Sequence, residues 1–445
     1  MSDETTRDAG AGADCLIVGG GLSGLACAQL LASAGKTVQV LEADVAVGGR
    51  ARTTMYQGEP VDRGFQSLFR AYPETRALCD GIGIGRDELR AFERGLVVHD
   101  GAKWRHVTTT RAGLLGSGLV SRRDAARLAA IAAVAAATPD RHLLEPDGRA
   151  ASANAYLAHR GVSDAALDGV LRPLFSGILL DRTLAADSGF LRYLIAMMAR
   201  GPAVLPVDGL GMIAQRSAES IIKSGGMIWT DVRVAALDCA TDGRSVTGVT
   251  LTDGRRVSAR HVVIAVDAGN ARRLLEDLDP ATAGRLPTDF AGVVSAAFAL
   301  EHPLYRERTI LLDGAAPSGD DRIDLICQTT NVTRPGSPGP HILIAQSATR
   351  GWSEVDPARY ADAVGSRIQA LIPSYPWKRS ATLVDTFVHS EALYRPLPGV
   401  RGMLPGPRTA IANLLVAGDA VMHPTIEGAV SSGRRAARIV QGMLG

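Results

Sequence analysis

The stretch DCLIVGGGLSG (residues 14–24) decides the fold of this 445-residue chain. Its apolar run, residues 14–18, ends in three glycines, and residues 22–34 have the composition of a helix. A second apolar run, TVQVL (residues 37–41), follows the helix. This alternation predicts a β-α-β unit, and such units imply a parallel sheet.

The glycines of this stretch have the spacing of a dinucleotide-binding loop. Gly19 permits the tight turn, Gly21 lets a pyrophosphate approach the backbone, and Gly24 lets helix and strand pack closely. The helix begins at Leu22 and Ser23, and its free N–H groups and partial positive charge face the phosphates.

A carboxylate at the end of the second strand supports this interpretation. Glu42 lies 18 residues beyond Gly24, where a carboxylate can bind both hydroxyls of a ribose. The sequence therefore predicts a bound dinucleotide; the alternative is a tight glycine turn followed by a surface glutamate.

A second glycine pair comes directly after Glu42. Gly48 and Gly49 precede Arg50, whose guanidinium can bind phosphate oxygens with two parallel hydrogen bonds. We interpret this loop as the far side of a pyrophosphate site, which a simple NAD site does not need. A solvated arginine turn is the alternative.

Composition excludes several other classes of protein. Apolar residues make up 46% of the chain and charged residues 21%, and the net charge of +2 indicates no polyanionic partner. The five cysteines have no C-x-x-C spacing and the histidines no metal-ligand spacing, so we expect neither a disulfide framework, nor a metal site, nor nucleic-acid binding. Residues 1–13 are polar and predict a flexible tail without a secretory signal, and a cytoplasmic location fits.

Further along the chain, two kinds of segment alternate. Residues 79–199 are expected to be mostly helical, whereas residues 227–264 contain strands separated by TDGR and TDGRR turns. Five more strand candidates between residues 293 and 393 predict a largely antiparallel sheet, with a helix at residues 360–371 beside it. NLLVA (residues 413–417) is a last buried strand before a closing helix.

The motifs at both ends and in the centre resemble the flavin amine oxidase superfamily, which includes monoamine and polyamine oxidases, protoporphyrinogen oxidases, and phytoene and carotene desaturases. The N-terminal part is VLEA (residues 40–43) with GGR (residues 48–50), and the C-terminal part is LVAGD (residues 415–419) with PTIEGAVSSGR (residues 424–434). The central part is LP with GLGM (residues 205–212), followed by DVRV (residues 231–234).

The resemblance implies non-covalently bound FAD as cofactor. It also implies that Gly64, Phe65 and Gln66 pass beside the isoalloxazine and that the main chain of Val234 meets the adenine, with Val232 as the register alternative. Asp419 can hydrogen-bond a ribityl hydroxyl. The positive end of the helix that begins at Gly428 and Ala429 can stabilise negative charge on the reduced flavin.

Glu427 is a further candidate for flavin contact, but its carboxylate would repel a reduced flavin. The alternatives are a hydrogen bond to nearby backbone and a role as a negative charge at the N-terminus of the helix. The sequence does not identify a catalytic residue. The complete set of predicted cofactor contacts is Gly19, Gly21, Leu22, Ser23, Gly24, Glu42, Ala43, Gly48, Gly49, Arg50, Gly64, Phe65, Gln66, Val234, Gly418, Asp419, Glu427, Gly428 and Ala429.

The chain departs from the amine oxidases of this superfamily. They share a lysine that reaches a water near flavin N5, but this sequence has no lysine between Lys223 and Lys378, so that group is absent unless Lys378 is folded in. No cysteine follows Cys327, so a C-terminal cysteinyl-flavin link cannot form. Aromatic residues are only 4% of the chain, so a cage of two aromatic side chains for an amine is not obvious, although Tyr394 could be one wall.

The ending EGA…SGR and the segment LRPLFSGI (residues 171–178) are closer to the desaturase and protoporphyrinogen oxidase branches. Residues 120–200 would then supply an apolar substrate tunnel; an ordinary helical core is the alternative. His423 could orient substrate or tune the flavin, or cap the turn before Pro424.

We therefore predict an α/β fold, α+β overall, with a Rossmann-like FAD-binding domain and a discontinuous substrate domain of mostly antiparallel sheet plus helices. The first would comprise residues 14–78, 200–270 and 392–445, the second residues 79–199 and 271–391. The expected reaction is hydride transfer from a small apolar substrate, an isoprenoid, polyene or tetrapyrrole, to flavin N5. The alternatives are an amine oxidase releasing hydrogen peroxide and a carotenoid-type isomerase without net redox. Peripheral membrane contact and oligomeric state are left open.

Overall fold

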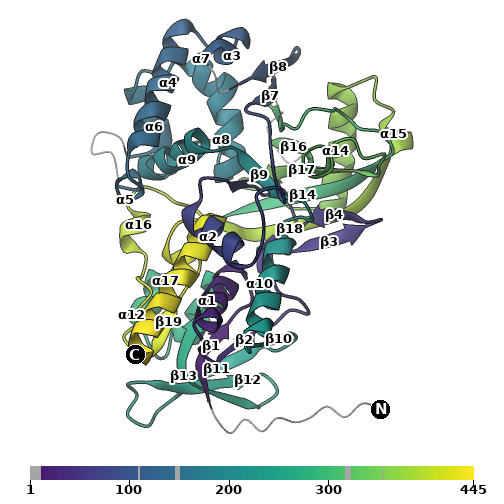
Figure 1. The fold of residues 1–445 in the computed structure, drawn as a ribbon. Coiled ribbons are helices and arrows are strands. Elements are labelled where there is room, and N and C mark those ends of the chain that lie inside the picture. Colours follow the sequence, from purple (N-terminus) through teal and green to yellow (C-terminus); the bar gives the residue numbers. More distant parts are fainter. Residues whose placement is uncertain (1–11, 109–110, 146–150, 316–321, 353) are drawn as a thin grey trace.

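The computed structural model describes residues 12–108, 111–145, 151–315, 322–352 and 354–445. The predicted tail falls on residues 1–13, of which residues 1–11 lie outside the described residues. Figure 1 shows a lower part built on the first sheet, an upper part of helices, and a second sheet beside them.

The lower part contains the predicted parallel sheet. Its strands run in the order β10-β2-β1-β13, and β19 pairs with the end of β13. Two antiparallel strands continue from the first residues of β13: β12 pairs with these residues, and β11 pairs with β12. The bounds are β1 Ala13–Val18, β2 Val38–Leu41, β10 Met227–Trp229, β11 Val234–Cys239, β12 Val246–Leu251, β13 Arg256–Ile264 and β19 Leu414–Val416.

Three helices pack on one face of this sheet: α1 (Leu22–Ser33), α10 (Gly211–Lys223) and α17 (Ile426–Leu444). The contact of α1 with α17 is close because Gly433 has no side chain; a Cβ there would collide with the carbonyl oxygen of Ser23. The opposite face is covered by the strands β11 and β12 with α11 (Ala268–Leu275) and α12 (Pro280–Arg285).

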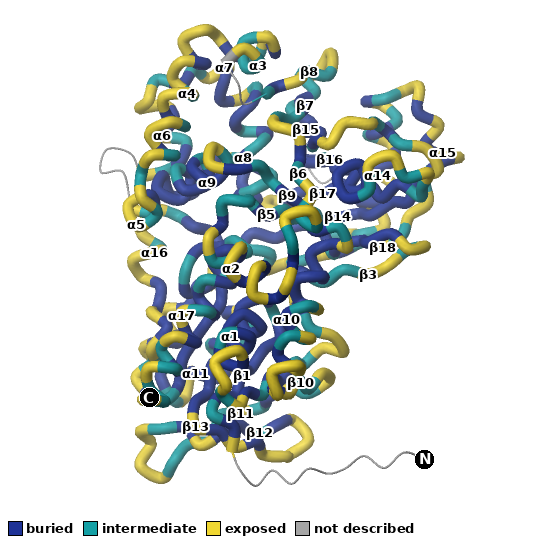
Figure 2. Tube along the Cα trace, viewed as in Figure 1, coloured by how far each residue is buried: buried dark blue, intermediate teal, exposed yellow. Residues whose placement is uncertain are grey.

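The second sheet has seven strands in the order β18-β14-β17-β16-β15-β7-β8, and only the β15–β7 pair is parallel. Helix α14 (Pro357–Leu371) packs against it through Tyr360, Val364 and Ile368, as predicted. Figure 2 shows its central strands buried, with exposed residues on the outer helices and loops. The bounds are β7 Leu96–His99, β8 Trp104–Val107, β14 Phe290–Leu300, β15 Leu311–Asp313, β16 Leu325–Gln328, β17 His341–Ala348 and β18 Ala381–Tyr394.

The upper part consists of short helices around a core that includes Tyr156, Phe175 and Leu191. Their bounds are α3 Arg111–Gly116, α4 Arg122–Ala137, α5 Asp140–Leu143, α6 Ala153–His159, α7 Asp164–Ala166, the π-helical turn η2 Leu167–Leu171, α8 Arg172–Leu179 and α9 Ser188–Arg200.

Small elements connect the three parts. Two are short sheets, β3–β4 and β5-β9-β6, and α2 lies against α17. The bounds are η1 Gly49–Ala51, β3 Thr53–Tyr56, β4 Glu59–Asp62, β5 Leu68–Phe69, α2 Pro73–Gly81, β6 Leu89–Ala91, β9 Ala203–Pro206, α13 Thr329–Thr333, α15 Trp377–Ser380, α16 Val400–Met403 and η3 Asp419–Val421.

The predicted α/β class is confirmed, with two local corrections. Residues 79–199 are not helical throughout, because β6, β7 and β8 lie within them and β7 and β8 complete the second sheet. Residues 229–237 (WTDVRVAAL), which we expected to form one of the strands within residues 227–264, belong to two strands, because Asp231 adopts a left-handed φ of 57° and turns the chain from β10 into β11. The domain boundaries themselves stay a prediction.

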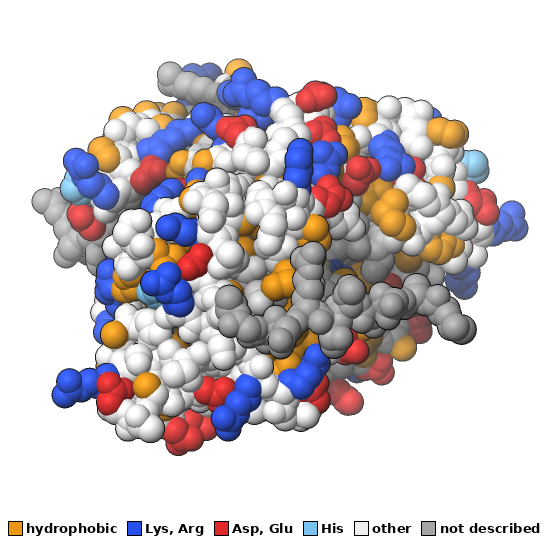
Figure 3. Space-filling view, turned by 60° about the horizontal axis from the view of Figure 1, so that its bottom comes forward, with side chains coloured by type: hydrophobic (Ala, Val, Ile, Leu, Met, Phe, Trp, Pro, Cys, Tyr) orange, Lys and Arg blue, Asp and Glu red, His pale blue; other side chains and the backbone are white. Residues whose placement is uncertain are grey.

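Within the described ranges, no helix combines the length and apolarity needed to cross a membrane. On the face seen in Figure 3, basic and acidic side chains lie interspersed over the described part of the surface. That face therefore carries charge of both signs rather than one basic field.

Candidate functional site

One large cavity of about 1300 Å³ runs from the parallel sheet into the helical part. Single-ligand pockets usually measure ~300–1,000 Å³, so this volume has room for two ligands. Its first half is lined by loops at the carboxyl ends of β1 and β2, and its second half by apolar residues of α4, α8 and α9. The carboxyl ends of parallel strands are where open α/β sheets bind ligands.

The glycine loop after β1 fits a pyrophosphate. Gly19 has a φ of 109°, which favours glycine, and a Cβ at Gly24 would collide with the carbonyl oxygen of Gly19. At Gly21, by contrast, a Cβ would meet nothing within 4 Å. The backbone at Gly21 therefore faces open space at the N-terminus of α1, where phosphate oxygens bind.

Glu42 lines the same half of the cavity and holds the loop as well. Its Oε2 accepts a hydrogen bond from the backbone N–H of Gly20 at 2.7 Å, and its Oε1 accepts one from Asp44 at 2.8 Å. A carboxylate with two oxygens each accepting one N–H still has lone pairs for ribose hydroxyls. Ala43 lines the cavity beside it.

The second glycine pair lies against the first loop. Gly48 forms a parallel bridge with Gly21 and has a left-handed φ of 116°. A Cβ on Gly49 would lie 3.5 Å from the Cα of Gly21, so the two loops approach through backbone alone. This packing forms one continuous cradle from the two loops that the sequence assigned to a pyrophosphate.

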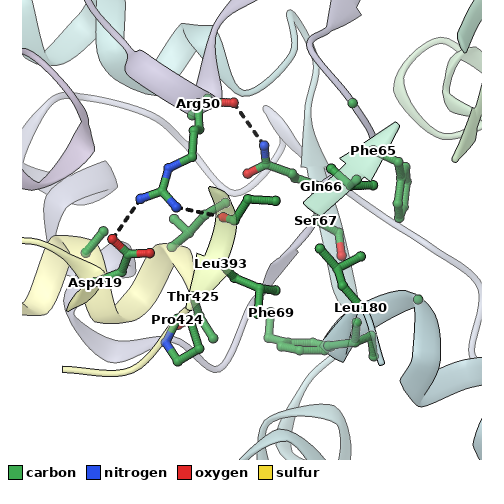
Figure 4. A pocket seen from close by; sticks show the side chains of 18 of the residues that line it. Arg50, Phe65, Gln66, Ser67, Phe69, Leu180, Leu393, Asp419, Pro424 and Thr425 are labelled. Atoms are coloured by element: carbon green, nitrogen blue, oxygen red, sulfur yellow. Dashed lines mark hydrogen bonds and ion pairs between the residues drawn. The ribbon is translucent and has the colours of Figure 1, made fainter. Parts of the chain in front are cut away.

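Arg50 joins three distant segments at this end of the cavity. Its Nη2 donates to Asp419 Oδ1 at 2.7 Å, and its Nη1 donates to the carbonyl oxygen of Ala392 at 2.7 Å. The negative charge of Asp419 raises the pKa of Arg50 further. Figure 4 shows Arg50 and Asp419 facing each other on one side, with Phe69 and Leu180 on the other.

The segment that the resemblance puts beside an isoalloxazine lies between this ion pair and the second sheet. Gly64 has a φ of 103°, and the N–H of Phe65 donates to Gln346 Oε1 on β17 at 3.0 Å. Gln66 Nε2 donates to the carbonyl oxygen of Arg50 at 2.9 Å. The segment is therefore fixed from both sides while all three of its residues line the cavity.

The other end of the cavity lies at the beginning of β11. Val234 and its register alternative Val232 both line it, so the cavity does not decide which of the two would meet the adenine. The N–H of Val232 donates to the carbonyl oxygen of Glu42 at 2.9 Å, which connects this end to the ribose side. Gly418 and Ala429 line the wall formed by the C-terminal segment.

The structure brings together most of the predicted contacts. Those lining the cavity are Gly19, Gly21, Leu22, Ser23, Glu42, Ala43, Gly48, Gly49, Arg50, Gly64, Phe65, Gln66, Val234, Gly418, Asp419 and Ala429. This set supplies a phosphate cradle, a ribose carboxylate and an arginine, the groups that an extended FAD requires.

Gly24, Glu427 and Gly428 are not among the described residues that line the cavity, and their assignment as cofactor contacts stays a prediction. Gly24 and Gly428 are places of close backbone approach, Gly428 to the carbonyl oxygen of His423. The buried carboxylate of Glu427 accepts hydrogen bonds from Glu74 N–H at 2.9 Å, and from Thr75 N–H and Oγ1 at 2.8 and 2.6 Å. It thus holds the N-terminus of α2, and burial raises its pKa.

Two other candidates also lie behind the lining. His423 is buried, its Nδ1 lies 2.9 Å from Thr425 Oγ1, and burial lowers its pKa to about 4. This hydrogen bond agrees with the second of the two roles considered for His423, which is to cap the turn before Pro424. Tyr394 is buried and donates to the carbonyl oxygen of Met422 at 3.2 Å, so its ring is no wall of the cavity.

Two lining residues had no signal in the sequence, whereas the apolar lining of the helical half agrees with the tunnel expected from residues 120–200. His389 lies on β18 and was one of several scattered histidines. Leu180 ends α8 with a left-handed φ of 51°, uncommon for a non-glycine residue. The helical half is lined by Leu114, Leu128, Ala129, Ile131, Ala132, Leu157, Val170, Leu171, Leu174, Phe175, Gly177, Ile178, Leu180, Leu194, Ile195, Met198 and Ala199.

Comparison with known proteins agrees with this site. The family of flavin-containing amine oxidoreductases matches residues 22–441. Protoporphyrinogen oxidase 2, chloroplastic/mitochondrial, of Arabidopsis thaliana is 44% identical over 68 residues, which is 15% of this chain and 13% of that protein. Coproporphyrinogen III oxidase of Mycobacterium leprae (strain TN) is 24% identical over 306 residues, 63% of this chain and 66% of that protein. Putrescine oxidase of Kocuria rosea is 39% identical over 71 residues, 16% of this chain and 15% of that protein.

Each of these matches thus spans less than two thirds of the relative's length. Among solved structures, an oxidoreductase from Methanosarcina mazei superposes with a TM-score of 0.72 at 18% identity, covering 95% of this chain and 99% of that one. Cyclohexylamine oxidase from Brevibacterium oxydans IH-35A gives a TM-score of 0.71 at 18% identity, covering 98% and 100%. At this identity the two structures show the shared fold alone.

The match over nearly the whole chain confirms the superfamily that the motifs indicated, and with it the flavin cofactor and the oxidoreductase class. The arrangement of the cavity agrees, because its phosphate cradle, ribose carboxylate and arginine come from the segments that carry those motifs. The chain belongs to the family of flavin-containing amine oxidoreductases.

Proposed function

We propose that this protein is an FAD-dependent oxidoreductase that dehydrogenates a small apolar substrate of the isoprenoid, polyene or tetrapyrrole class. The observation that carries the proposal is the apolar lining of the helical half of the cavity. All of its lining residues between positions 114 and 199 are uncharged and apolar. Burying apolar ligand surface there contributes roughly 25 cal/mol per Å².

The chain's own residues position the reactants. The cradle of Gly21 and Gly48, with Glu42 and Arg50, would hold the dinucleotide extended along the first half of the cavity. When bound, FAD supplies the hydride acceptor. The segment from Gly64 to Gln66 lines the same cavity, and the apolar residues of its helical half would surround the substrate.

The absence of lysine from the lining supports an apolar substrate over an amine. None of the four lysines lines the cavity, and Lys378 is exposed on α15 at the edge of the second sheet. Of the relatives named above, two are porphyrinogen oxidases and one is a putrescine oxidase, so tetrapyrroles are the first donors to test.

The test is an anaerobic absorbance titration of the purified flavoprotein. The donors with an apolar core are detergent-dispersed phytoene and the porphyrinogens protoporphyrinogen IX and coproporphyrinogen III, whose macrocycle carries propionate groups at its edge. We refer to these three as the apolar donors, and putrescine and cyclohexylamine are the amine donors. Bleaching of the flavin band by an apolar donor is expected. Bleaching by amines alone would overturn the proposal in favour of an amine oxidase, and isomerised phytoene without net oxidation would indicate an isomerase.

A further inference from the structure

His389 is the single histidine among the described residues that line the cavity. It lies on β18, of which residues 388–393 all line the cavity, and it pairs across the sheet with Val293, another lining residue. The side chain is half-buried. A titratable nitrogen at this place has no role yet in the proposed reaction.

The hydrogen bond of the imidazole fixes its tautomer. His389 Nε2 lies 3.0 Å from the backbone carbonyl oxygen of Arg63. A carbonyl oxygen can only accept, so Nε2 must carry the proton, and in the neutral ring the lone pair is on Nδ1. No described residue forms a hydrogen bond with Nδ1.

The surroundings favour the neutral ring. Burial lowers the pKa of His389; the Arg63 carbonyl opposes this, and the positive charges of Arg50 and Arg63 add to the lowering. Glu391, two residues along β18, also lines the cavity, and Arg50 is already paired with Asp419. At neutral pH a basic nitrogen is therefore available.

The location is the redox end of the cavity rather than the adenine end. Arg63, whose carbonyl oxygen holds the ring, directly precedes the segment from Gly64 to Gln66 that the family resemblance puts beside the isoalloxazine. Val234, at the opposite end, lies on the first sheet. His389 therefore lines the cavity next to the segment where the flavin ring is expected.

We propose that His389 is the general base of the dehydrogenation, with Nδ1 accepting the substrate's proton. This rests on the proposed function. One C–H bond of the substrate breaks and its hydrogen leaves with the electron pair to the flavin. The adjacent C–H or N–H bond breaks, its proton goes to Nδ1, and its electron pair forms the new π bond. The substrate loses two electrons and the flavin gains them.

The variant His389→Gln separates the hydrogen bond that the ring donates to Arg63 from the proposed acceptance of a proton. Glutamine Nε2 can still donate to the Arg63 carbonyl oxygen, but its side chain has no basic nitrogen. We expect flavin reduction by the donor that bleaches the wild type to slow by ~100-fold or more, the usual contribution of a general base. His106→Gln, on the exposed face of β8, is the matched control and should react at the wild-type rate.

The pH profile distinguishes a base from a structural residue. Since Nδ1 must be unprotonated to act, the wild-type rate should rise with pH through the pKa of His389, below the ordinary ~6.5 of histidine, and then level off. In His389→Gln this acidic limb should disappear while the ratio of flavin to protein equals that of the wild type.

A second measurement is independent of turnover. Nitrogen-15 NMR of the histidine-labelled holoenzyme at pH 7 should show the ring that is missing in His389→Gln as neutral, protonated at Nε2 and unprotonated at Nδ1. A proton on Nδ1 would overturn the inference.

The outcomes separate the two proposals. A wild type that an apolar donor reduces, with His389→Gln equally fast and equally dependent on pH, would overturn the base and leave the proposed function standing. A wild type that no apolar donor reduces would overturn the proposed function and the base together.

Discussion

Glu427 holds Thr75 by two hydrogen bonds, from the backbone N–H at 2.8 Å and from the hydroxyl at 2.6 Å. These residues are 352 positions apart in the sequence, and the pair joins the first turn of α17 to the first turn of α2. A negative charge at a helix N-terminus is stabilising because it meets the unpaired N–H groups and the positive end of the dipole. The side chain that the motif placed at the flavin thus fixes a neighbouring helix.

Glu427→Gln should therefore lower stability without removing the flavin. The amide has one acceptor oxygen for three donors, so at least one buried N–H or hydroxyl is left weakly paired, at a cost of about 1–3 kcal/mol. Urea unfolding of the holoprotein measures the loss, and the flavin absorbance ratio measures occupancy. Loss of flavin at unchanged stability would instead indicate that Glu427 contacts the flavin directly.

The first glycine loop allows two alanine substitutions with opposite consequences. Gly21→Ala meets no atom within 4 Å and keeps an ordinary φ of −72°, so the protein should fold but bind FAD weakly, because the new methyl group points at the phosphates. Gly24→Ala would collide with the Gly19 carbonyl oxygen and should prevent folding. Circular dichroism and flavin titration separate the two, and normal FAD affinity in Gly21→Ala would contradict the assigned cradle.

Glu42→Gln should weaken flavin retention. Glu42 accepts hydrogen bonds from Gly20 and Asp44 with both of its oxygens, and a glutamine must turn its NH₂ group toward one of these N–H donors. Loss of the carboxylate also removes the partner of the ribose hydroxyls. The ratio of flavin to protein after dialysis is the measurement, with the exposed Glu219→Gln of α10 as control. Unchanged occupancy would refute the role of Glu42.

Asp62 should give stability a characteristic dependence on pH. It is buried against Thr53 and accepts a hydrogen bond from Leu210 N–H at 2.9 Å, and burial raises its pKa to about 6 from the ordinary 3.8. A raised pKa means that the folded state binds the proton more tightly, so this contribution is fully present below pH 3.8 and is lost as pH rises through 6. The change is roughly 3 kcal/mol.

The comparison with Asp62→Asn isolates that contribution, because asparagine does not titrate. Between pH 4 and pH 7 the unfolding free energy of the wild type should fall relative to that of the variant. Parallel curves for the two proteins would show that Asp62 is ionised throughout.

A charge in the helical half of the cavity should abolish reaction with apolar donors. Ile178 lines the cavity on α8, and Ile178→Glu would place a carboxylate on an apolar wall where an isoprenoid or tetrapyrrole core must bind. Flavin content should be normal and reduction by the apolar donor lost. Val134→Glu, on the exposed side of α4, is the control. Equal reduction rates in both variants would place the substrate elsewhere.

The sequence by itself determined the half of the site that binds the cofactor. Gly19, Gly21 and Glu42 lie within 24 residues of each other, so strand, turn and helix position them locally. Their residue types also leave little choice, since only glycine tolerates the conformation of Gly19 or the backbone contact at Gly24. Local geometry of this kind can be predicted from a motif.

Only the tertiary structure decided the rest. Whether Glu427 points to the flavin or to α2 depends on the packing of α17 against a helix more than 350 residues away. His389 became a cavity residue because β18 pairs with β14 and brings the ring against the Arg63 carbonyl. The apolar half is formed by α4, α8 and α9, whose apolar residues could equally have filled an ordinary core. Such contacts join distant segments, and no local pattern specifies which side chain faces the cavity.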